Sequence, residues 1–207
     1  GDWRAARRPG EEAFAGATRG PRGGSEWAVM PQTVTREVLA EARFLAGTAA
    51  QKLGRWERAL SHFQSAMRDC PGVVATVPAF FYGTATSQAV LGDLDAALSN
   101  FRTYESAIKK GNFVPNTVQR MMLSFNIGQT LVRMQRDEEA RQAFQDVFAR
   151  SGSSKGEAAP ESKSAGPLEE KERRAIVAAA HYWTAVSAGA LGKPKEAVAH
   201  LEAFESA

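Results

Sequence analysis

Apolar residues recur along this chain at helical spacings of three and four, in a register that repeats. The first copy begins at a turn centred on Gly54, and the next segment places Ala59, Phe63 and Ala66 on one helix face. The same register follows Gly92 with Ala97, Phe101 and Tyr104, Gln135 with Ala140, Phe144 and Val147, and Gly192 with Ala197, Leu201 and Phe204. Four copies of one register are typical of a repeat protein whose core grows by stacking.

Breaks in the apolar pattern divide the chain into expected helices. The Pro71-Gly72 pair is expected to end the second helix, and Thr33 or Thr35 and then Asp93 are expected to cap the first and the fourth. Gln135 stands where the other turns have glycine, so we expect a less tight corner there. The expected helices cover about 33–53, 56–70, 78–91, 93–110, 116–134, 137–150, 167–191 and 194–205.

Composition agrees with an all-helical chain that stays outside membranes. Alanine is abundant and β-branched residues are sparse. Residues 175–191 carry no formal charge, but they are few for a membrane span and rich in alanine, so we expect a buried helix and no membrane insertion. Cys70 is the only cysteine, which excludes an internal disulfide and favours a reducing compartment. We therefore expect an intracellular, soluble protein of the cytoplasm, with the mitochondrial matrix or another organellar complex as the alternative.

The pattern divides the chain into a basic arm at 1–34, three helical hairpins at 35–150, a low-complexity insert at 151–166 expected to be disordered, and a fourth hairpin at 167–207. Within the arm, residues 19–24 have a likeness to the arginine-glycine segments that bind RNA, and a solvated arm is the alternative. The net charge of +3 is too small for a nucleic-acid signature of the whole chain. Large aromatic residues are unusual in a solvated arm, so Trp3, Phe14 and Trp27 are expected to dock on a surface.

Catalytic chemistry is not indicated. His62, His181 and His200 show no metal-ligand spacing with one another or with Cys70. The segment 189–194 ends like a phosphate-binding loop, but it lacks the glycine spacing and has proline where a hydroxyl side chain should hold magnesium. We expect no enzyme activity, no catalytic or metal-binding residue, no cofactor and no small-molecule substrate.

The register of turn, small residue and large apolar residue resembles the tetratricopeptide repeat, a pair of antiparallel helices of about thirty-four residues. The helices before the turns agree, because the residue seven positions before each turn is small: Gly47, Ala85, Gly128 and Ala185. The run 124–129 is the most similar to the family's first helix, whereas Gln135 at a turn, Leu201 at an aromatic position and longer linkers depart from it. The resemblance covers about 40–207 and implies an all-α, right-handed α-solenoid of about four such hairpins.

The resemblance also implies a concave groove, lined by the first helix of each repeat, that holds a peptide or a partner's helix. Aromatic residues, named here the aromatic row, stand ten positions before each turn: Phe44, Tyr82, Phe125 and Tyr182. By the family's pattern they face the groove, beside Thr48, Thr86, Gln129 and Val186; the alternative is that the rings fill gaps between repeats. The basic clamp with which some members hold a chaperone's carboxyl terminus is largely missing, which disfavours that ligand.

The last expected helix presents Val198, Leu201 and Phe204 with no polar capping helix after it, which predicts an interface with a partner. The sequence thus predicts a non-catalytic protein-interaction scaffold or adaptor, a subunit of a larger assembly, that binds an apolar peptide, an amphipathic helix or neighbouring subunits. The alternative is an RNA-associated subunit that uses the arginine- and glycine-rich arm.

Overall fold

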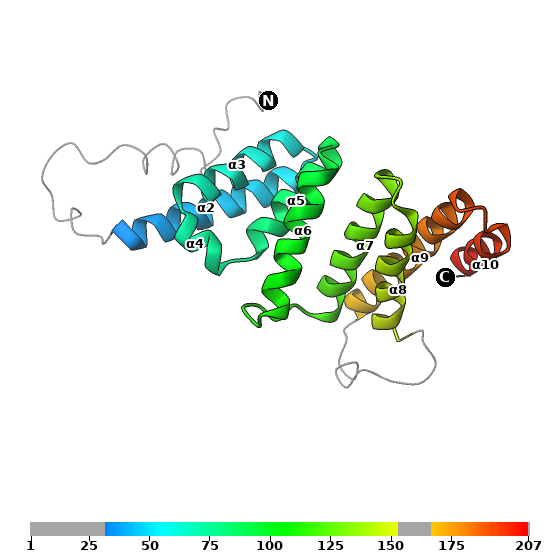
Figure 1. Cartoon of the computed structure of the whole chain (residues 1–207). Coiled ribbons are helices and arrows are strands. Elements are labelled where there is room, and N and C mark those ends of the chain that lie inside the picture. Colours follow the sequence, from blue (N-terminus) through cyan, green and yellow to red (C-terminus); the bar gives the residue numbers. More distant parts are fainter. Residues whose placement is uncertain (1–31, 153–166, 207) are drawn as a thin grey trace, which may run out of the picture. The chain divides into compact units, whose positions relative to one another are not determined.

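The computed structural model describes residues 32–152 and 167–206, and in these residues all the regular secondary structure is helical (Figure 1). The helices are α2 (Gln32–Lys52), α3 (Trp56–Asp69), α4 (Pro71–Thr76), α5 (Ala79–Leu91), α6 (Leu94–Lys109), α7 (Thr117–Arg133), α8 (Asp137–Arg150), α9 (Pro167–Ala190) and α10 (Pro194–Glu205). All of them except α4 correspond to an expected helix, and the all-α prediction is confirmed. Trp3, Phe14 and Trp27 lie outside the described residues, as does most of the expected insert.

The short helix α4 departs from the sequence prediction. The break falls where it was expected, since α3 ends at Asp69, but Pro71 then begins a new helix. Proline suits a first helical position because its ring fixes φ and its missing N–H would have no partner there. The Cys70 carbonyl accepts hydrogen bonds from the N–H groups of Val73 and Val74, each at 3.1 Å, and these close the first turn.

The helix starts differ in how they are capped. α2 begins before Thr33, so Thr33 and Thr35 both lie inside the helix and the prediction that one of them caps it is wrong. Asp93 occupies the N-cap position of α6 as expected, although its side chain makes no capping hydrogen bond. α7 has a complete capping box: the Gln119 N–H donates to Asn116 Oδ1 at 2.8 Å, and the Asn116 N–H donates to Gln119 Oε1 at 3.0 Å.

The four hairpin turns share one backbone geometry. The central residue has a positive φ in each turn: 69° at Gly54, 93° at Gly92, 59° at Gln135 and 68° at Gly192. The N–H of the following residue donates to the carbonyl five positions earlier, from Arg55 to Ala50 at 2.9 Å, Asp93 to Gln88 at 3.0 Å, Arg136 to Leu131 at 2.9 Å and Lys193 to Ala188 at 2.8 Å. The expectation of a less tight corner at Gln135 is therefore wrong, and Gln135 adopts a left-handed conformation that strains a residue with a Cβ.

The chain forms two compact units, with the boundary inside α5 between Gly83 and Thr84. In the first unit the fully buried ring of Phe63 fills the centre, with its centroid 6.4 Å from that of Phe80. A Cβ added to Gly47 would lie 2.6 Å from the Phe63 ring, and one added to Gly83 would lie 2.7 Å from it. Glycine at these positions lets α2 and α5 approach the ring closely.

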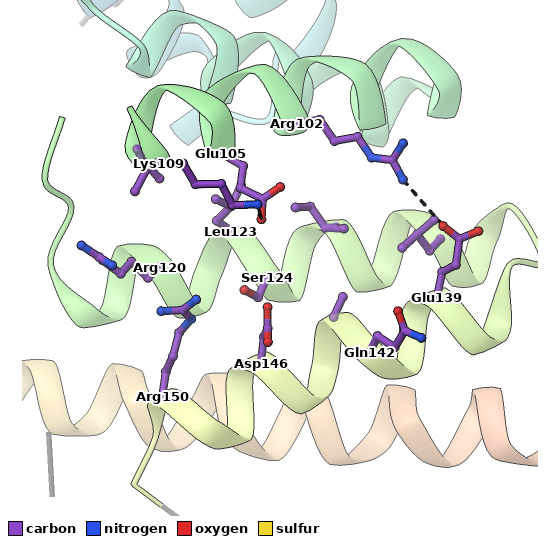
Figure 2. Close-up of a pocket in the computed structure, with 14 residues that line it drawn as sticks. Arg102, Glu105, Lys109, Arg120, Leu123, Ser124, Glu139, Gln142, Asp146 and Arg150 are labelled. Atoms are coloured by element: carbon purple, nitrogen blue, oxygen red, sulfur yellow. Dashed lines mark ion pairs between the residues drawn. The ribbon is translucent and has the colours of Figure 1, made fainter. Parts of the chain in front are cut away.

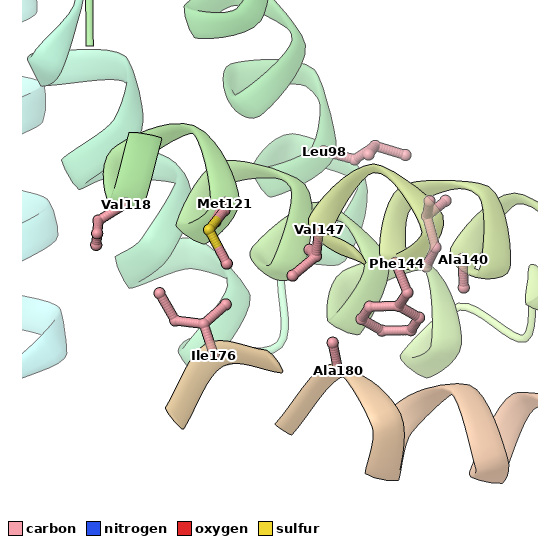
Figure 3. Packing of buried hydrophobic residues seen from close by; sticks show 9 residues of the cluster. Leu98, Val118, Met121, Ala140, Phe144, Val147, Ile176 and Ala180 are labelled. Carbon is pink, nitrogen blue, oxygen red and sulfur yellow. The ribbon is translucent and has the colours of Figure 1, made fainter. Parts of the chain in front are cut away.

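Phe144 has the same role in the second unit. Figure 3 shows its ring beside Ala140 of α8 and Ala180 of α9. The same buried cluster continues along the three helices with Val118, Met121, Val147 and Ile176. A Cβ added to Gly128 would lie 2.6 Å from the Phe144 ring. α9 packs against both α7 and α8, so it closes the core that these two helices leave open.

The uncharged segment 175–191 falls mainly in α9 and contributes to this core. Ile176, Ala180 and Ala188 are buried there. Among the described helices, none has both the length and the apolar character that a membrane span requires.

Candidate partner-binding surfaces

The aromatic row is divided between the two units, with Phe44 and Tyr82 in the first and Phe125 and Tyr182 in the second. Phe44, in the first unit, is partly buried; its ring centroid lies 5.9 Å from that of Phe63 and 5.1 Å from that of Phe80. Thr48, one turn further along α2, donates a hydrogen bond from Oγ1 to the Phe44 carbonyl at 2.9 Å. Phe44 thus contributes to the core as well as to the surface.

The other residues of the row, and the residues beside it, differ in the exposed fraction of their side chains. Tyr82 and Thr86 on α5 are partly buried, and so are Phe125 and Gln129 on α7. The Phe125 ring centroid lies 6.1 Å from that of Phe144, so this side chain also touches the core. On α9, Tyr182 is 44% exposed and Val186 is 39% exposed.

Tyr182 on α9 lies next to an apolar residue of the last helix, α10. The Tyr182 ring centroid lies 5.9 Å from that of Phe204. We name this surface the α9–α10 face and define it as Tyr182, Val186, Val198, Leu201 and Phe204. Val198 is 53% exposed, and Leu201 and Phe204 are each 42% exposed. α10 has no buried residue at all, unlike α3, α6, α7 and α8.

Polar contacts hold α10 in place. The Arg141 guanidinium on α8 forms an ion pair with Glu196, and Lys193 Nζ lies 2.8 Å from Glu138 Oε1. The Nδ1 atoms of His181 and His200 lie 2.9 Å apart. α10 is therefore anchored along the side facing α8 and α9.

The histidine pair was not foreseen from the sequence, because His181 and His200 lie on different helices. Both imidazoles pack on Phe148, with ring centroids 4.4 Å and 5.8 Å from its own. Burial lowers the pKa of both histidines; the charge of His200 lowers that of His181 further, and Glu196 raises while Arg141 lowers that of His200. In the described residues, no three or more His, Cys, Asp or Glu side chains are grouped so as to hold a metal ion.

A pocket of about 420 Å³ lies between α6 and α8, with α7 as its floor (Figure 2). We name it the α6–α8 pocket. Its floor contains Leu123, Ser124, Ile127 and Leu131 of α7. The sequence register did not foresee this pocket, because the register gives the face of each helix but not the gap between two neighbours.

Charged side chains from α6, α7 and α8 surround the α6–α8 pocket: Arg102, Glu105, Lys109, Arg120, Glu139, Asp146 and Arg150. Lys109 Nζ lies 3.1 Å from Glu105 Oε1, and Arg102 Nη2 lies 3.6 Å from Glu139 Oε2. The hydrogen bond and the charge of Arg136, and after them the charge of Arg102, hold the pKa of Glu139 below its usual value.

Comparison with known proteins identifies the repeat. The family model of the tetratricopeptide repeat matches residues 41–72, which hold most of α2 and all of α3. Residues 41–72 are a tetratricopeptide repeat. The three other hairpins of the register share the turn geometry of this repeat. No curated protein matches the chain.

Solved structures of MamA, also a tetratricopeptide-repeat protein, have a similar fold. One MamA crystal structure has a TM-score of 0.57 at 12% identity, over 81% of this chain and 77% of that one. The MamA MSR-1 structure gives 0.56 at 16% identity, over 84% of this chain and 83% of that one. At such identities the likeness shows the fold alone, and the fold is the α-solenoid that the sequence predicts.

The aromatic row and the α6–α8 pocket use opposite sides of α7, which is the first helix of the third hairpin. At 100° per residue, Phe125 and Gln129 each lie about 160° around the helix from Ile127. The aromatic row and the α6–α8 pocket are therefore distinct sites.

Proposed function

We propose that this chain is a non-catalytic scaffold of a multiprotein assembly and binds a partner's amphipathic helix on the α9–α10 face. The observation that carries the proposal is a difference in burial between equivalent positions. Phe144 and Val147 of α8 are fully buried, whereas Leu201 and Phe204, at the same places in the register, are each 42% exposed. Tetratricopeptide-repeat proteins are generally interaction modules, which favours a partner over a substrate.

The contacts of α9 indicate what such a partner looks like. α9 covers α7 and α8 with Ile176 and Ala180, which lie four residues apart on one helix face. An incoming helix with an aliphatic residue and a small residue at this spacing would cover Leu201 and Phe204 in the same way. Exposed apolar side chains of this kind gain free energy when they leave water, at about 25 cal/mol per Å² of apolar surface.

One contact of α9 has no counterpart on the α9–α10 face. Ser187 Oγ lies 2.8 Å from Asp137 Oδ1 and donates to the Asp137 carbonyl at 3.1 Å. Pro194 stands at the position equivalent to Asp137, so the side-chain acceptor is missing. A partner helix therefore meets no side-chain acceptor at that place, and we propose that its binding relies on apolar contacts.

We further propose that, within the second unit, Phe125 and Tyr182 of the aromatic row continue this apolar surface and hold an extended or helical segment of the same partner. Tyr182 of the row and Val186, which lies beside the row, both belong to the α9–α10 face. Phe44 and Phe125 also touch Phe63 and Phe144, so removing these two rings would disturb the core. The two exposed residues of α9 are therefore the better test of the row.

The experiment is a pull-down from native extract, with mass spectrometry, on three forms of the full chain. Two carry double substitutions, Val198→Ser with Leu201→Ser on the face, and Val38→Ser with Leu45→Ser as a control on α2, where the side chains are 58% and 60% exposed. We expect the face variant to lose partners that the wild type and the control retain. Equal partner sets for all three, with unchanged circular dichroism, would count against the proposal.

An RNA-associated function stays an alternative prediction, since its arginine-glycine stretch lies outside the described residues. It would give RNA binding that weakens steeply with salt and disappears when residues 1–29 are removed. The interaction on the α9–α10 face would persist through moderate salt, because apolar contacts are little screened. The single, buried Cys70 suits a reducing compartment, and we propose the cytoplasm ahead of an organelle.

A further inference from the structure

We propose that the α6–α8 pocket is a second binding site, and that it takes an extended peptide segment in which a large apolar residue is followed by a carboxylate. This site goes beyond the proposed function, because it lies on the side of α7 away from Phe125 and Gln129 and includes no residue of the α9–α10 face. Three features of the pocket support the proposal: its apolar floor, the charges at one end and its size.

The floor can receive an apolar side chain. Leu123 and Leu131 of α7 are 5% and 2% exposed, and Ile127 lies between them on the same face. Ile108 of α6 and Ala143 of α8 face the same space from the two walls. An apolar side chain placed there would replace water over a surface of methyl and methylene groups.

One end of the pocket carries more positive than negative charge, with three cations against the two anions Glu105 and Asp146. The C-terminal ends of α6 and α8 and the N-terminal end of α7 meet there, and these bring Lys109, Arg120 and Arg150 together (Figure 2). Lys109 is paired with Glu105, but among the described residues neither Arg120 nor Arg150 has an acidic group within ion-pair distance. The single negative charge of Asp146 balances the charge of only one of these two arginines.

A carboxylate is the ligand group that these arginines favour. Each guanidinium offers planar N–H donors that match the two oxygens of a carboxylate. Arg120 uses one donor, because its Nε lies 3.3 Å from the Pro115 carbonyl, and this contact orients the rest of the group. The other end of the pocket is nearly neutral, because Arg102 there faces Glu139.

The distance between the two features sets the spacing within the ligand. Ile127 and Arg120 lie seven residues apart on α7, or about 10 Å along its axis. An extended chain advances about 3.3 Å per residue, so the apolar residue and the acidic residue should be three positions apart. A volume of about 420 Å³ accommodates one or two side chains of an extended segment but is too small for a whole helix.

The test uses full-length protein and a set of synthetic peptides in fluorescence anisotropy. Each peptide carries fluorescein, one tryptophan and one glutamate in a glycine-serine chain, with zero to four residues between the two. We expect the tightest binding with two intervening residues. Replacing the glutamate by glutamine should weaken binding about tenfold, as is typical for loss of a charge-assisted hydrogen bond.

Two variants of the protein separate the two features of the site. Arg120→Ser with Arg150→Ser should abolish the preference for glutamate over glutamine, whereas Ala143→Leu, which adds volume to the wall, should weaken every peptide that contains tryptophan. The charge-matched control is Arg36→Ser with Arg55→Ser in the first unit, on side chains far from the pocket in sequence. Thermal melts of all variants establish that each of them folds.

The outcomes decide the proposal in either direction. A glutamate preference that depends on Arg120 and Arg150, and survives in the control variant, supports it. Absence of binding by every peptide up to about 1 mM, or equal loss in the control, overturns it. A twelve-nucleotide oligouridylate is measured in parallel; if it binds more tightly than any peptide and depends on the same arginines, the assignment to a peptide is wrong.

Discussion

Replacing Gly128 by alanine should destabilise the protein, although alanine is the better helix former. A Cβ at this position would lie 2.6, 2.8 and 2.9 Å from the Cε1, Cζ and Cδ1 atoms of the Phe144 ring. These contacts are far inside van der Waals distance, and Phe144 is fully buried among α7, α8 and α9, so the ring has no free space to enter. The helices would have to move apart.

The magnitude follows from two opposing effects. Overpacking a tight core costs about 1–3 kcal/mol, and contacts this short suggest the upper end, about 3 kcal/mol. Glycine to alanine inside a helix gains about 1 kcal/mol. We therefore expect Gly128→Ala to lower the free energy of unfolding by about 2 kcal/mol, measured by urea denaturation with circular dichroism.

A matched substitution on α9 isolates the packing effect. Gly189 is also helical, but a Cβ there would have no heavy atom within 4 Å. Gly189→Ala should therefore raise the free energy of unfolding, by up to about 1 kcal/mol. The difference of about 3 kcal/mol between the two variants then measures the overpacking alone.

A second substitution tests whether the Phe144 ring is responsible. In the fourth hairpin, Leu201 stands at the position equivalent to Phe144, and Ala185 stands at the position equivalent to Gly128. A leucine in place of the phenylalanine thus occurs together with an alanine in place of the glycine. Phe144→Leu should therefore cost less in the Gly128→Ala background than alone. The reasoning would be refuted if Gly128→Ala changed the unfolding free energy by less than about 0.5 kcal/mol, which is within the usual range for surface substitutions. Such a result would mean that the helices re-space around the added methyl group; an alanine and a phenylalanine do occupy the equivalent positions of the second hairpin, where Ala85 and Phe101 are both fully buried.

Three further predictions concern stability. Gln135→Gly should raise the free energy of unfolding by about 0.5–1 kcal/mol in urea, because it relieves the positive φ of 59°; an unchanged or lower value would mean that the turn carries no strain. Asn116→Ala should lower it by about 1 kcal/mol through loss of the capping box, and Asn116→Ser should restore most of that. Burial lowers the pKa of His181 and His200, so below the unfolded-state pKa of about 6.5 the unfolded chain binds more protons than the folded one. The free energy of unfolding therefore decreases as the pH falls through this range. Melting temperatures should fall between pH 7.5 and 5.5, and His200→Gln should make that fall smaller; an equal fall in both proteins would contradict this assignment.

The sequence predicts the helices well because the signals are local. Glycine at the turns, proline and asparagine at helix starts and the spacing of alanine and phenylalanine act within a few residues of where they stand. Two of the departures have a physical explanation. Pro71 ends one helix but is equally suited to begin the next, and Gln135 adopts the positive φ of the other three turns so that α8 packs against α7.

The surfaces are harder to predict because they depend on distances between helices. The register places Phe125 correctly on α7, but only the structure shows that its ring reaches Phe144. It gives no sign that His181 and His200 meet, since their contact depends on how α9 and α10 pair. The α6–α8 pocket depends in the same way on the space that α6 and α8 leave above α7.

The most direct test of the central claim is a photo-crosslinking experiment on the α9–α10 face. The photoreactive amino acid p-benzoylphenylalanine replaces Phe204 in one form of the full chain and Leu45, the exposed control on α2, in another. Both are irradiated in native extract, and the adducts are mapped by mass spectrometry. We predict that the Phe204 position alone crosslinks to a segment with helical apolar spacing, in which an aliphatic residue and a small residue lie four positions apart. Identical adducts from both positions, or none from Phe204, would contradict a partner helix on this face.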